Sequence, residues 1–222
     1  MTTLQANIDS IVTESLKAFK PKPLTQIVNN LPPHAFDDRD YRKAAVYAIL
    51  DDAARVLVIQ KPCYNDGYPW GGQIAFPGGH VEKDDGSFLQ AALREVSEEV
   101  GITGRQLDTI GSLGCFPTIR QVSIEAFIGF INGPVDPKPQ DSEVACVMWA
   151  SLADLLRTHL TNGYINADVS VNELLYPIGD LTIWGATARI IQFLFNTVLT
   201  QANYMLNIQD LAPNHKLYMR PE

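Results

Sequence analysis

The 222-residue sequence contains few cysteines, and their positions form no recognisable pattern. Cys63, Cys115 and Cys146 are far apart in the chain, with no Cys-x-x-Cys pair. This spacing excludes the disulfide framework of a small secreted domain and a cysteine-based zinc site. The four histidines also lack the spacing of metal ligands. We therefore expect the chain to work in a reducing compartment, the cytoplasm.

Long apolar runs and an excess of positive charge are also missing. No uninterrupted apolar stretch reaches the ~18 residues that a membrane-spanning helix needs. The N-terminus lacks a basic segment followed by an apolar core, so we expect no signal peptide. Only 17 Lys and Arg residues oppose 25 Asp and Glu residues, which gives a net charge of -8. Since nucleic-acid binding needs clustered basic side chains, we expect a small-molecule partner, not a membrane or a nucleic-acid polymer.

Length and composition indicate one main domain. The chain is 46% hydrophobic and 19% charged, and it is long enough to build a single well-packed core. Apolar residues recur at helical spacing over 3–19, which predicts an N-terminal helix. Four prolines within 20–40 predict an extended linker after it. We divide the chain into an N-terminal extension (1–40), a main domain (41–201) and a C-terminal tail (202–222).

Patterns in the main domain alternate between those of strands and those of helices. Apolar runs at 44–50 and 55–59 predict a hairpin that turns at Asp51-Asp52. Further strands are expected at 109–116, 122–131, 144–149 and 181–183, and further helices at 151–159 and 184–201. Such an order indicates an α/β fold, in which a mixed sheet is covered by helices on both sides.

The most distinctive segment begins with a Phe-Pro-Gly-Gly turn at 76–79 and continues into a predicted helix at 87–100. Ser87 is a good N-cap residue, and Gln90 three residues later completes a capping-box pattern. Gly101 suits the left-handed residue that ends many helices. The local sequence therefore defines both ends of this helix.

Three carboxylates share one face of the predicted helix. Glu95, Glu98 and Glu99 stand at positions i, i+3 and i+4. Carboxylate oxygens suit Mg²⁺ or Mn²⁺, which also bind substrate phosphates and then polarise them for attack by water. Arg94 has helical spacing to Glu98 and is expected to pair with the cluster. Considered alone, the cluster is also compatible with a solvated acidic helix face.

The whole segment resembles the Nudix box, the signature of hydrolases that cut nucleoside-linked diphosphates. Its pattern is G-x5-E-x7-R-E-U-x-E-E-x-G-U, where U is a bulky apolar residue. Gly79 matches the first glycine, and the second half matches in full from Arg94 to Ile102. In the middle, Asp85 stands in place of the glutamate, and eight residues instead of seven follow it. The resemblance implies the Nudix-type α/β/α sandwich with a mixed β-sheet, here with an N-terminal helical extension.

Two further segments are similar to the coenzyme A pyrophosphatases among the Nudix proteins. Residues 72–79 are similar to the stretch G-Q-x-x-F-P-G-G, and residues 184–190 resemble W-G-x-T-A-x-I. Together with the box, the resemblance covers about residues 42–200. Two positions depart from the pattern, since Tyr68 and Lys61 stand where it has arginines. These changes concern recognition of the leaving group and not the fold or the chemistry.

The resemblance implies how the motif residues would act. Glu95, Glu98 and Glu99 would hold the Mg²⁺ or Mn²⁺ ions, with the backbone carbonyl of Gly79 as a further ligand. Arg94 would pair with these glutamates and not with the substrate.

A base and several substrate contacts are also implied. Either Glu143, just before a predicted strand, or Glu95 would activate the attacking water, and the sequence leaves this choice open. The candidates for substrate binding are Lys61, Gly78, Gly79, Arg120 and Tyr68. The charges of Lys61 and Arg120 are equally compatible with a solvated surface, and Tyr68 with packing of its loop.

The expected reaction is metal-dependent hydrolysis of coenzyme A or an acyl-CoA to 3',5'-ADP and (acyl-)4'-phosphopantetheine. ADP-ribose, nucleotide sugars or dinucleotides are alternatives, because Lys61 lacks the bidentate fork of arginine and the 62–70 loop is rich in aromatic residues. A non-catalytic nucleotide-binding module is the third alternative, and the intact glutamate set counts against it. By analogy with the family we also expect a homodimer.

Overall fold

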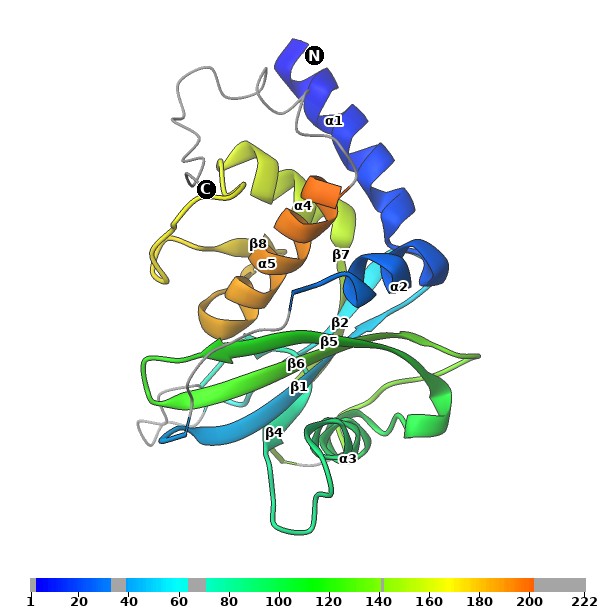
Figure 1. Ribbon diagram of the computed structural model, residues 1–222, viewed down its shortest axis with the longest axis vertical. Helices are drawn as coiled ribbons and strands as arrows, with labels where there is room; N and C mark the ends of the chain where they lie inside the picture. The colour runs from blue at the N-terminus through cyan, green and yellow to red at the C-terminus, as the bar shows by residue number, and fades with distance from the viewer. Residues whose placement is uncertain (1–2, 33–38, 64–70, 141, 202–222) are drawn as a thin grey trace.

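The computed structural model describes residues 3–32, 39–63, 71–140 and 142–201 (Figure 1). Its elements are α1 (Thr3–Ser15), η1 (Leu16–Ala18), α2 (Pro21–Asn29), β1 (Arg42–Leu50), β2 (Arg55–Gln60), β3 (Ile74–Ala75), β4 (Gly78–His80), α3 (Phe88–Val100), η2 (Gly104–Gln106), β5 (Leu107–Pro117), β6 (Val122–Ile131), β7 (Cys146–Ser151), α4 (Leu152–Thr161), β8 (Tyr176–Ile178), β9 (Leu181–Ile183) and α5 (Gly185–Gln201). Among the helices in these ranges, none has both the length and the hydropathy that a bilayer crossing requires.

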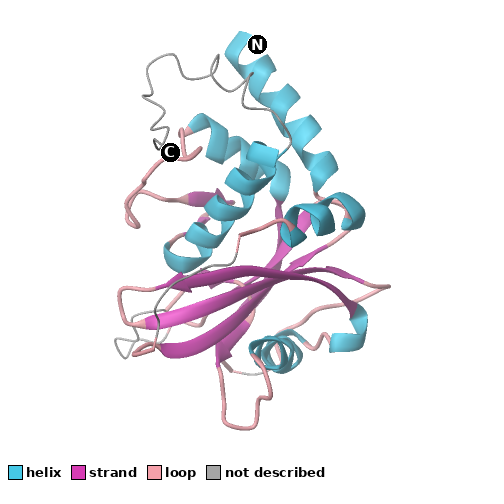
Figure 2. Ribbon diagram, viewed as in Figure 1, coloured by secondary structure: helices cyan, strands magenta, loops and turns pink. Residues whose placement is uncertain are grey.

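Within the described residues, the longer strands form one mixed sheet with β1 near its centre (Figure 2). β6 runs parallel to β1 along its full length. On the other side of β1, β2 returns as the predicted hairpin, with Leu50 opposite Val56, and β4 places Gly79 beside Ala45. β7 lies along β2 at one edge of the sheet, and β5 lies along β6 at the other.

The two faces of the sheet bury different clusters of side chains, because successive residues of a strand point to opposite faces. One set from β1 and β2 packs against α3: Ala45, Tyr47, Ile49, Leu57 and Ile59. The intervening residues belong to the cluster on the other face: Ala48, Leu50, Val56 and Val58. Figures 1 and 2 show α3 on the first face and α1, α2, α4 and α5 on the second. The predicted three-layer α/β/α arrangement is therefore present.

The N-terminal extension is helical over a longer stretch than the sequence pattern predicts. The extended linker expected for 20–40 is wrong for residues 21–29, which form α2. Pro21 lies at the start of this helix, where its fixed φ suits helical geometry and its missing N–H would have no helical partner. Leu24, Ile27 and Val28 are buried on the inner side of α2, which contacts β5 and α5.

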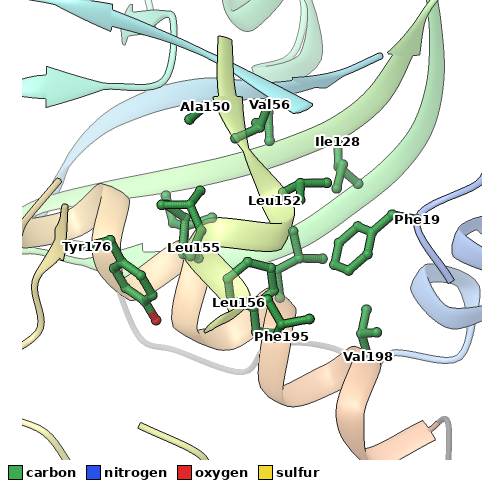
Figure 3. Packing of buried hydrophobic residues seen from close by; sticks show 14 of the residues in the cluster. Phe19, Val56, Ile128, Ala150, Leu152, Leu155, Leu156, Tyr176, Phe195 and Val198 are labelled. Carbon is green, nitrogen blue, oxygen red and sulfur yellow. The ribbon is translucent and has the colours of Figure 1, made fainter. Parts of the chain in front are cut away.

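Phe19, between α1 and α2, connects the extension to the rest of the core. Its side chain is fully buried, and its ring meets Phe195 of α5 edge-on, with 5.9 Å between the ring centroids (Figure 3). Truncating a buried phenylalanine to alanine typically costs about 3–5 kcal/mol. The helices of the extension therefore contribute to the same hydrophobic cluster as α4 and α5.

α3 begins and ends where the local sequence predicts. The Ser87 hydroxyl accepts a hydrogen bond from the Gln90 N–H at 3.1 Å, and Gly101 ends the helix with a φ of 72°. The second half of the expected capping box differs, because the Gln90 side chain accepts from the Gly86 N–H at 2.8 Å. The helix that carries the acidic cluster is thus fixed at both ends.

A buried polar cluster lies on the face opposite α3, where α4, β8 and α5 meet. His159 is fully buried against the rings of Tyr164, Tyr176 and Phe195. Its Nδ1 lies 2.9 Å from the Tyr176 hydroxyl, and its Nε2 lies 3.1 Å from Asn196 Oδ1. Since the amide oxygen accepts, Nε2 carries the proton and Nδ1 accepts from the tyrosine. Burial lowers the pKa of His159 to about 3, so the ring is neutral near pH 7.

The neutral His159 predicts a specific loss of stability in acid. Its pKa falls from an ordinary value of 6.5 to about 3 in the folded protein. The stabilisation is complete above the unfolded pKa and is lost by about 1.4 kcal/mol per pH unit as the pH falls toward the folded pKa. Urea unfolding of wild type and His159→Gln measures this, since the wild type should lose its advantage over the variant between about pH 6.5 and about pH 4.5. Parallel pH profiles for the two proteins would contradict the prediction.

Candidate active site

Arg94 on α3 holds the exposed end of the acidic cluster. Its guanidinium binds Asp85 through two hydrogen bonds, from Nε to Oδ1 at 3.1 Å and from Nη2 to Oδ2 at 3.0 Å. Nη1 reaches Glu95 at 3.0 Å and Glu98 at 2.9 Å, and the Glu98 contact has the helical spacing expected from the sequence. The Arg94 hydrogen bonds hold the pKa of Asp85 below its ordinary value. Arg94 therefore ties the loop that follows β4 to α3.

Glu95 packs directly against the glycine pair. A Cβ on Gly79 would lie only 2.3 Å from Glu95 Oε1, so the carboxylate occupies space that any larger residue would fill. Burial raises the pKa of Glu95, and the Arg94 guanidinium opposes that rise. The Glu95 carboxylate and Gly79 therefore lie side by side in the structure.

Glu99 is buried, and both of its oxygens have partners. The residue is 2% exposed. Its Oε1 forms a short ion pair with Lys61 Nζ, and its Oε2 accepts a hydrogen bond from the Gly78 N–H at 2.8 Å. Burial raises the pKa of Glu99, and the two contacts limit the rise. Glu99 therefore anchors the end of β2 and the glycine turn to α3.

Lys61 lies among three carboxylates. It follows β2 directly, and its N–H donates to the Gln73 carbonyl at 2.9 Å, which fixes its backbone. Burial alone would lower the pKa of Lys61, but Glu99, Glu143 and Glu95 together raise it above its ordinary value. The Lys61 ammonium thus contacts Glu99 of α3 and also responds to the charges of Glu143, before β7, and Glu95.

The loop before β7 brings Glu143 to this cluster. On one side the Gln140 N–H donates to the Glu99 carbonyl at 3.1 Å, and on the other the Ala145 N–H donates to the Gln60 carbonyl at 2.8 Å. These two hydrogen bonds attach Gln140 to the end of α3 and Ala145 to the end of β2, on either side of Glu143 in the sequence. Glu143 is exposed whereas Glu99 is buried, so Glu143 stands at the solvent side of the cluster.

The other candidates for substrate binding are placed differently. Gly78 has a φ of 151°, and a Cβ there would lie 2.3 Å from the Ala45 carbonyl oxygen, so this glycine is required by the backbone. Arg120 is exposed in the turn between β5 and β6, away from the β4–α3 segment in the chain. Tyr68 lies outside the described residues.

The two segments that resemble the coenzyme A pyrophosphatase signature meet in space. Gly185, at the start of α5, has a φ of 68°, and a Cβ there would lie 3.4 Å from Gln73 Nε2. β3 and β9 contact each other beside this point. The Gln73 carbonyl accepts a hydrogen bond from the Lys61 N–H, so the meeting point of the two segments is also connected to a residue of the acidic cluster.

The donors around Gly79 fit hard divalent cations, which prefer carboxylate and carbonyl oxygens. The three motif glutamates come from a single turn of α3, and Gly79 leaves room for the nearest of them. As they stand, no three acidic, histidine or cysteine side chains in the described part of the chain converge closely enough to hold an ion. Instead, the glutamates bind Arg94 and Lys61.

A cavity of about 530 Å³ lies elsewhere, beside edge strand β7. Its lining includes Trp149, Asp154 and the β8–β9 segment 177–179. None of the motif residues lines it, so it is separate from the candidate active site.

Sequence reasoning missed two partnerships in this site. Asp85 is the bidentate partner of Arg94, and the signal for it was its alignment with the glutamate of the box. Lys61 is the partner of Glu99, 38 residues away, whereas the sequence assigned it to the substrate. The signal for Lys61 was strand alternation, because Ile59 faces α3 and Lys61 two residues later shares that face.

A protein-family model described as the NUDIX domain matches residues 40–169. The uncharacterized Nudix hydrolase NudL of Citrobacter koseri is 34% identical over 124 residues, which are 54% of this chain and 64% of that protein. The same-named protein of Shigella boydii serotype 4 is 35% identical over the same shares. The matched region thus spans less than two thirds of the length of these curated relatives.

Among solved structures, the chain is similar to the C. elegans Ap4A hydrolase in a binary complex. It is 26% identical in sequence, and the match covers 50% of this chain and 81% of that one, with a TM-score of 0.43. A TM-score of that size supports no argument about the substrate of this chain.

The two glycines of the turn predict losses of stability of different size on substitution by alanine. At Gly78 the added Cβ would meet backbone, Ala45 O at 2.3 Å and Val46 Cα at 2.6 Å, so Gly78→Ala should lose about 2–4 kcal/mol of unfolding free energy. At Gly79 the three atoms nearest to the Cβ all belong to the Glu95 carboxylate, the end of a flexible side chain, so Gly79→Ala should lose about 1 kcal/mol or less. Urea unfolding of both variants measures the difference, and equal losses would refute this account of the turn.

Proposed function

This chain belongs to the NUDIX domain family, and from that premise we propose that it is a metal-dependent hydrolase of nucleoside diphosphate derivatives. The observation that carries the proposal is the closure of Glu95 and Glu99 over the Gly78–Gly79 turn, with Lys61 among them. This arrangement brings two carboxylates, the backbone of the glycine turn and the Lys61 ammonium together at the segment that matches the Nudix box. A solvated acidic helix face would not bury Glu99 or depend on a glycine beneath Glu95.

Mg²⁺ or Mn²⁺ is the cofactor we assign to this site, as hydrolases of the family generally use such ions. The ligands would be the Gly79 carbonyl together with Glu95, Glu98 and Glu99. When bound there, a divalent cation supplies positive charge that polarises the phosphoryl oxygens of a diphosphate. Arg94 keeps Glu95 and Glu98 oriented through its hydrogen bonds to both.

Glu143 is the residue we assign to accept the proton of the attacking water. It stands at the exposed side of the cluster, where water enters, and its charge acts on Lys61. Glu95 is less suited to this role, because it packs on Gly79 and is held by Arg94. A general base needs a position within hydrogen-bond reach of the water, and the loop anchors at Gln140 and Ala145 keep Glu143 near the cluster.

Coenzyme A or an acyl-CoA is the substrate we propose. The support is the meeting of the two signature segments at Gln73 and Gly185, beside the backbone of Lys61. ADP-ribose, a nucleotide sugar or a dinucleotide is the second candidate. This candidate is favoured because Lys61 pairs with Glu99. The diphosphate therefore lacks the contact that an arginine of the coenzyme A signature would make at this position.

Product analysis by mass spectrometry tests the substrate. Purified protein with Mg²⁺ or Mn²⁺ should convert coenzyme A to 3',5'-ADP and 4'-phosphopantetheine faster than it cleaves ADP-ribose or NADH. Release of AMP from ADP-ribose or NADH, without cleavage of coenzyme A, would support the assignment as a hydrolase and overturn the assignment of coenzyme A as its substrate.

The acidic cluster predicts the effect of single substitutions on turnover. Glu98→Gln should lower kcat by about 100-fold or more at saturating Mg²⁺, because it removes a charged ligand while leaving a largely exposed side chain of the same shape. Glu82→Gln is the matched control, since Glu82 lies in the neighbouring loop, 3.8 Å from Arg94, and should retain wild-type kcat. Steady-state kinetics and thermal unfolding of both variants measure this. Full metal-dependent activity in a folded Glu98→Gln protein would overturn the assignment.

A further inference from the structure

Lys61 and Glu99 form an ion pair that conflicts with a second role for each residue. Glu99 Oε1 is engaged by Lys61 and Oε2 by the Gly78 N–H, so Glu99 has no oxygen left without a partner in this structure. Each carboxylate oxygen has two lone pairs, so the Gly78 N–H can stay on Oε2 when Glu99 binds a metal ion, whereas the Lys61 ammonium on Oε1 competes with that ion for the same negative charge. For Lys61 to bind a diphosphate, its ammonium has to leave Glu99.

The Gly78 contact is the fixed one of the two. Gly78 lies in β4, where it pairs with Val46 of β1, and its backbone is hemmed in by Ala45 and Val46. Its N–H therefore cannot turn away from Glu99 without disturbing the sheet. Lys61 differs because its charge lies at the end of a flexible four-carbon stem, and its side chain is 18% exposed.

Arg94, the other cation at the cluster, has no comparable freedom. Its two parallel hydrogen bonds to Asp85 and its contact with the His80 carbonyl at 3.1 Å use a rigid planar fork. Lys61 in contrast places a compact point charge on Glu99, and the negative charges of Glu143 and Glu95 also act on it. An ammonium that several carboxylates attract lies where a divalent cation would also be attracted.

We propose that Lys61 is a displaceable cation. In the metal-free protein it forms the ion pair with Glu99, and when a divalent ion takes its place at Glu99, its ammonium binds the substrate diphosphate. The proposal rests on the proposed function, because it takes Glu99 as a metal ligand. It assigns Lys61 two partners in turn, Glu99 first and the diphosphate second.

The exchange has a thermodynamic consequence. While no diphosphate is present, Lys61 competes with the metal ion for Glu99 and weakens metal binding. A diphosphate gives the released ammonium a new partner, so metal and diphosphate strengthen each other's binding, and the coupling is reciprocal. Removing the lysine charge should therefore tighten binding of the metal alone and reduce its coupling to the diphosphate.

Isothermal titration of the purified 222-residue chain with Mn²⁺ tests this without any turnover. Mn²⁺ is titrated alone and then in the presence of methylenediphosphonate, a diphosphate that cannot be hydrolysed. The proteins are wild type, Lys61→Met and Lys17→Met. Lys17 is the control because it forms an exposed ion pair with Glu14 on the N-terminal helices, outside the acidic cluster.

With Mn²⁺ alone, Lys61→Met should bind about tenfold tighter than wild type, and Lys17→Met should match wild type. Methylenediphosphonate should tighten Mn²⁺ binding in wild type and clearly less in Lys61→Met. Lys61→Arg, which keeps the charge but adds a fork, should not bind Mn²⁺ more tightly than wild type. If Lys61→Met does not fold, Lys61→Gln replaces it, with the same expectation.

Two results would overturn the proposal, and they are distinguishable. Wild type that binds Mn²⁺ while the folded Lys61→Met or Lys61→Gln variant binds it equally or more weakly refutes the displacement and leaves the hydrolase assignment intact. Wild type that binds no Mn²⁺, with or without methylenediphosphonate, refutes the metal site and the proposed function with it.

Discussion

The buried carboxylate of Glu99 is the constraint on which the candidate site depends. A carboxylate that is 2% exposed costs several kcal/mol unless it is paired and hydrogen-bonded. Here the Lys61 ammonium and the Gly78 N–H meet that requirement. The two partners come from the residue after β2 and from the glycine turn at β4, two strands of the same sheet, whereas Glu99 itself comes from α3. The need to satisfy one charge therefore fixes the relative positions of the parts that carry the chemistry.

At the exposed side of α3, the negative charge of the glutamates is compensated in a different way. Three glutamates within one turn repel each other and disfavour an isolated helix. Arg94 offsets part of this repulsion by binding Glu95 and Glu98, and it is itself held by Asp85. A further contribution comes from the buried apolar residues of the helix that pack against the sheet: Ala91, Ala92 and Val96. Packing on the sheet thus helps to hold three glutamates close together, although Glu99 is itself buried.

The features that could be predicted from the sequence are those that depend on residues close together in the chain. Ser87 and Gly101 set the ends of α3, and Ser151 caps α4 as expected, because caps act within one helical turn. The α2 error has an equally local cause, since a proline was taken as a break where it begins a helix. The Lys61–Glu99 pair could not be found in this way, because it joins residues brought together only by the packing of α3 on the sheet. The family pattern supplied Glu95, Glu98 and Glu99 as a set, but not the fact that one of them is buried.

The identity of residue 61 carries more physical information than its charge alone. An arginine there would present a planar fork that binds a carboxylate through two parallel hydrogen bonds, and such a pair is difficult to open. A lysine makes a single contact through a small, strongly hydrated group, so water or another cation can replace it at lower cost. Beside a carboxylate with both oxygens engaged, this difference decides whether the site is locked or can exchange its cation. We therefore expect that a lysine at this position, where the coenzyme A signature has an arginine, affects the acidic cluster first, because its observed partner is Glu99.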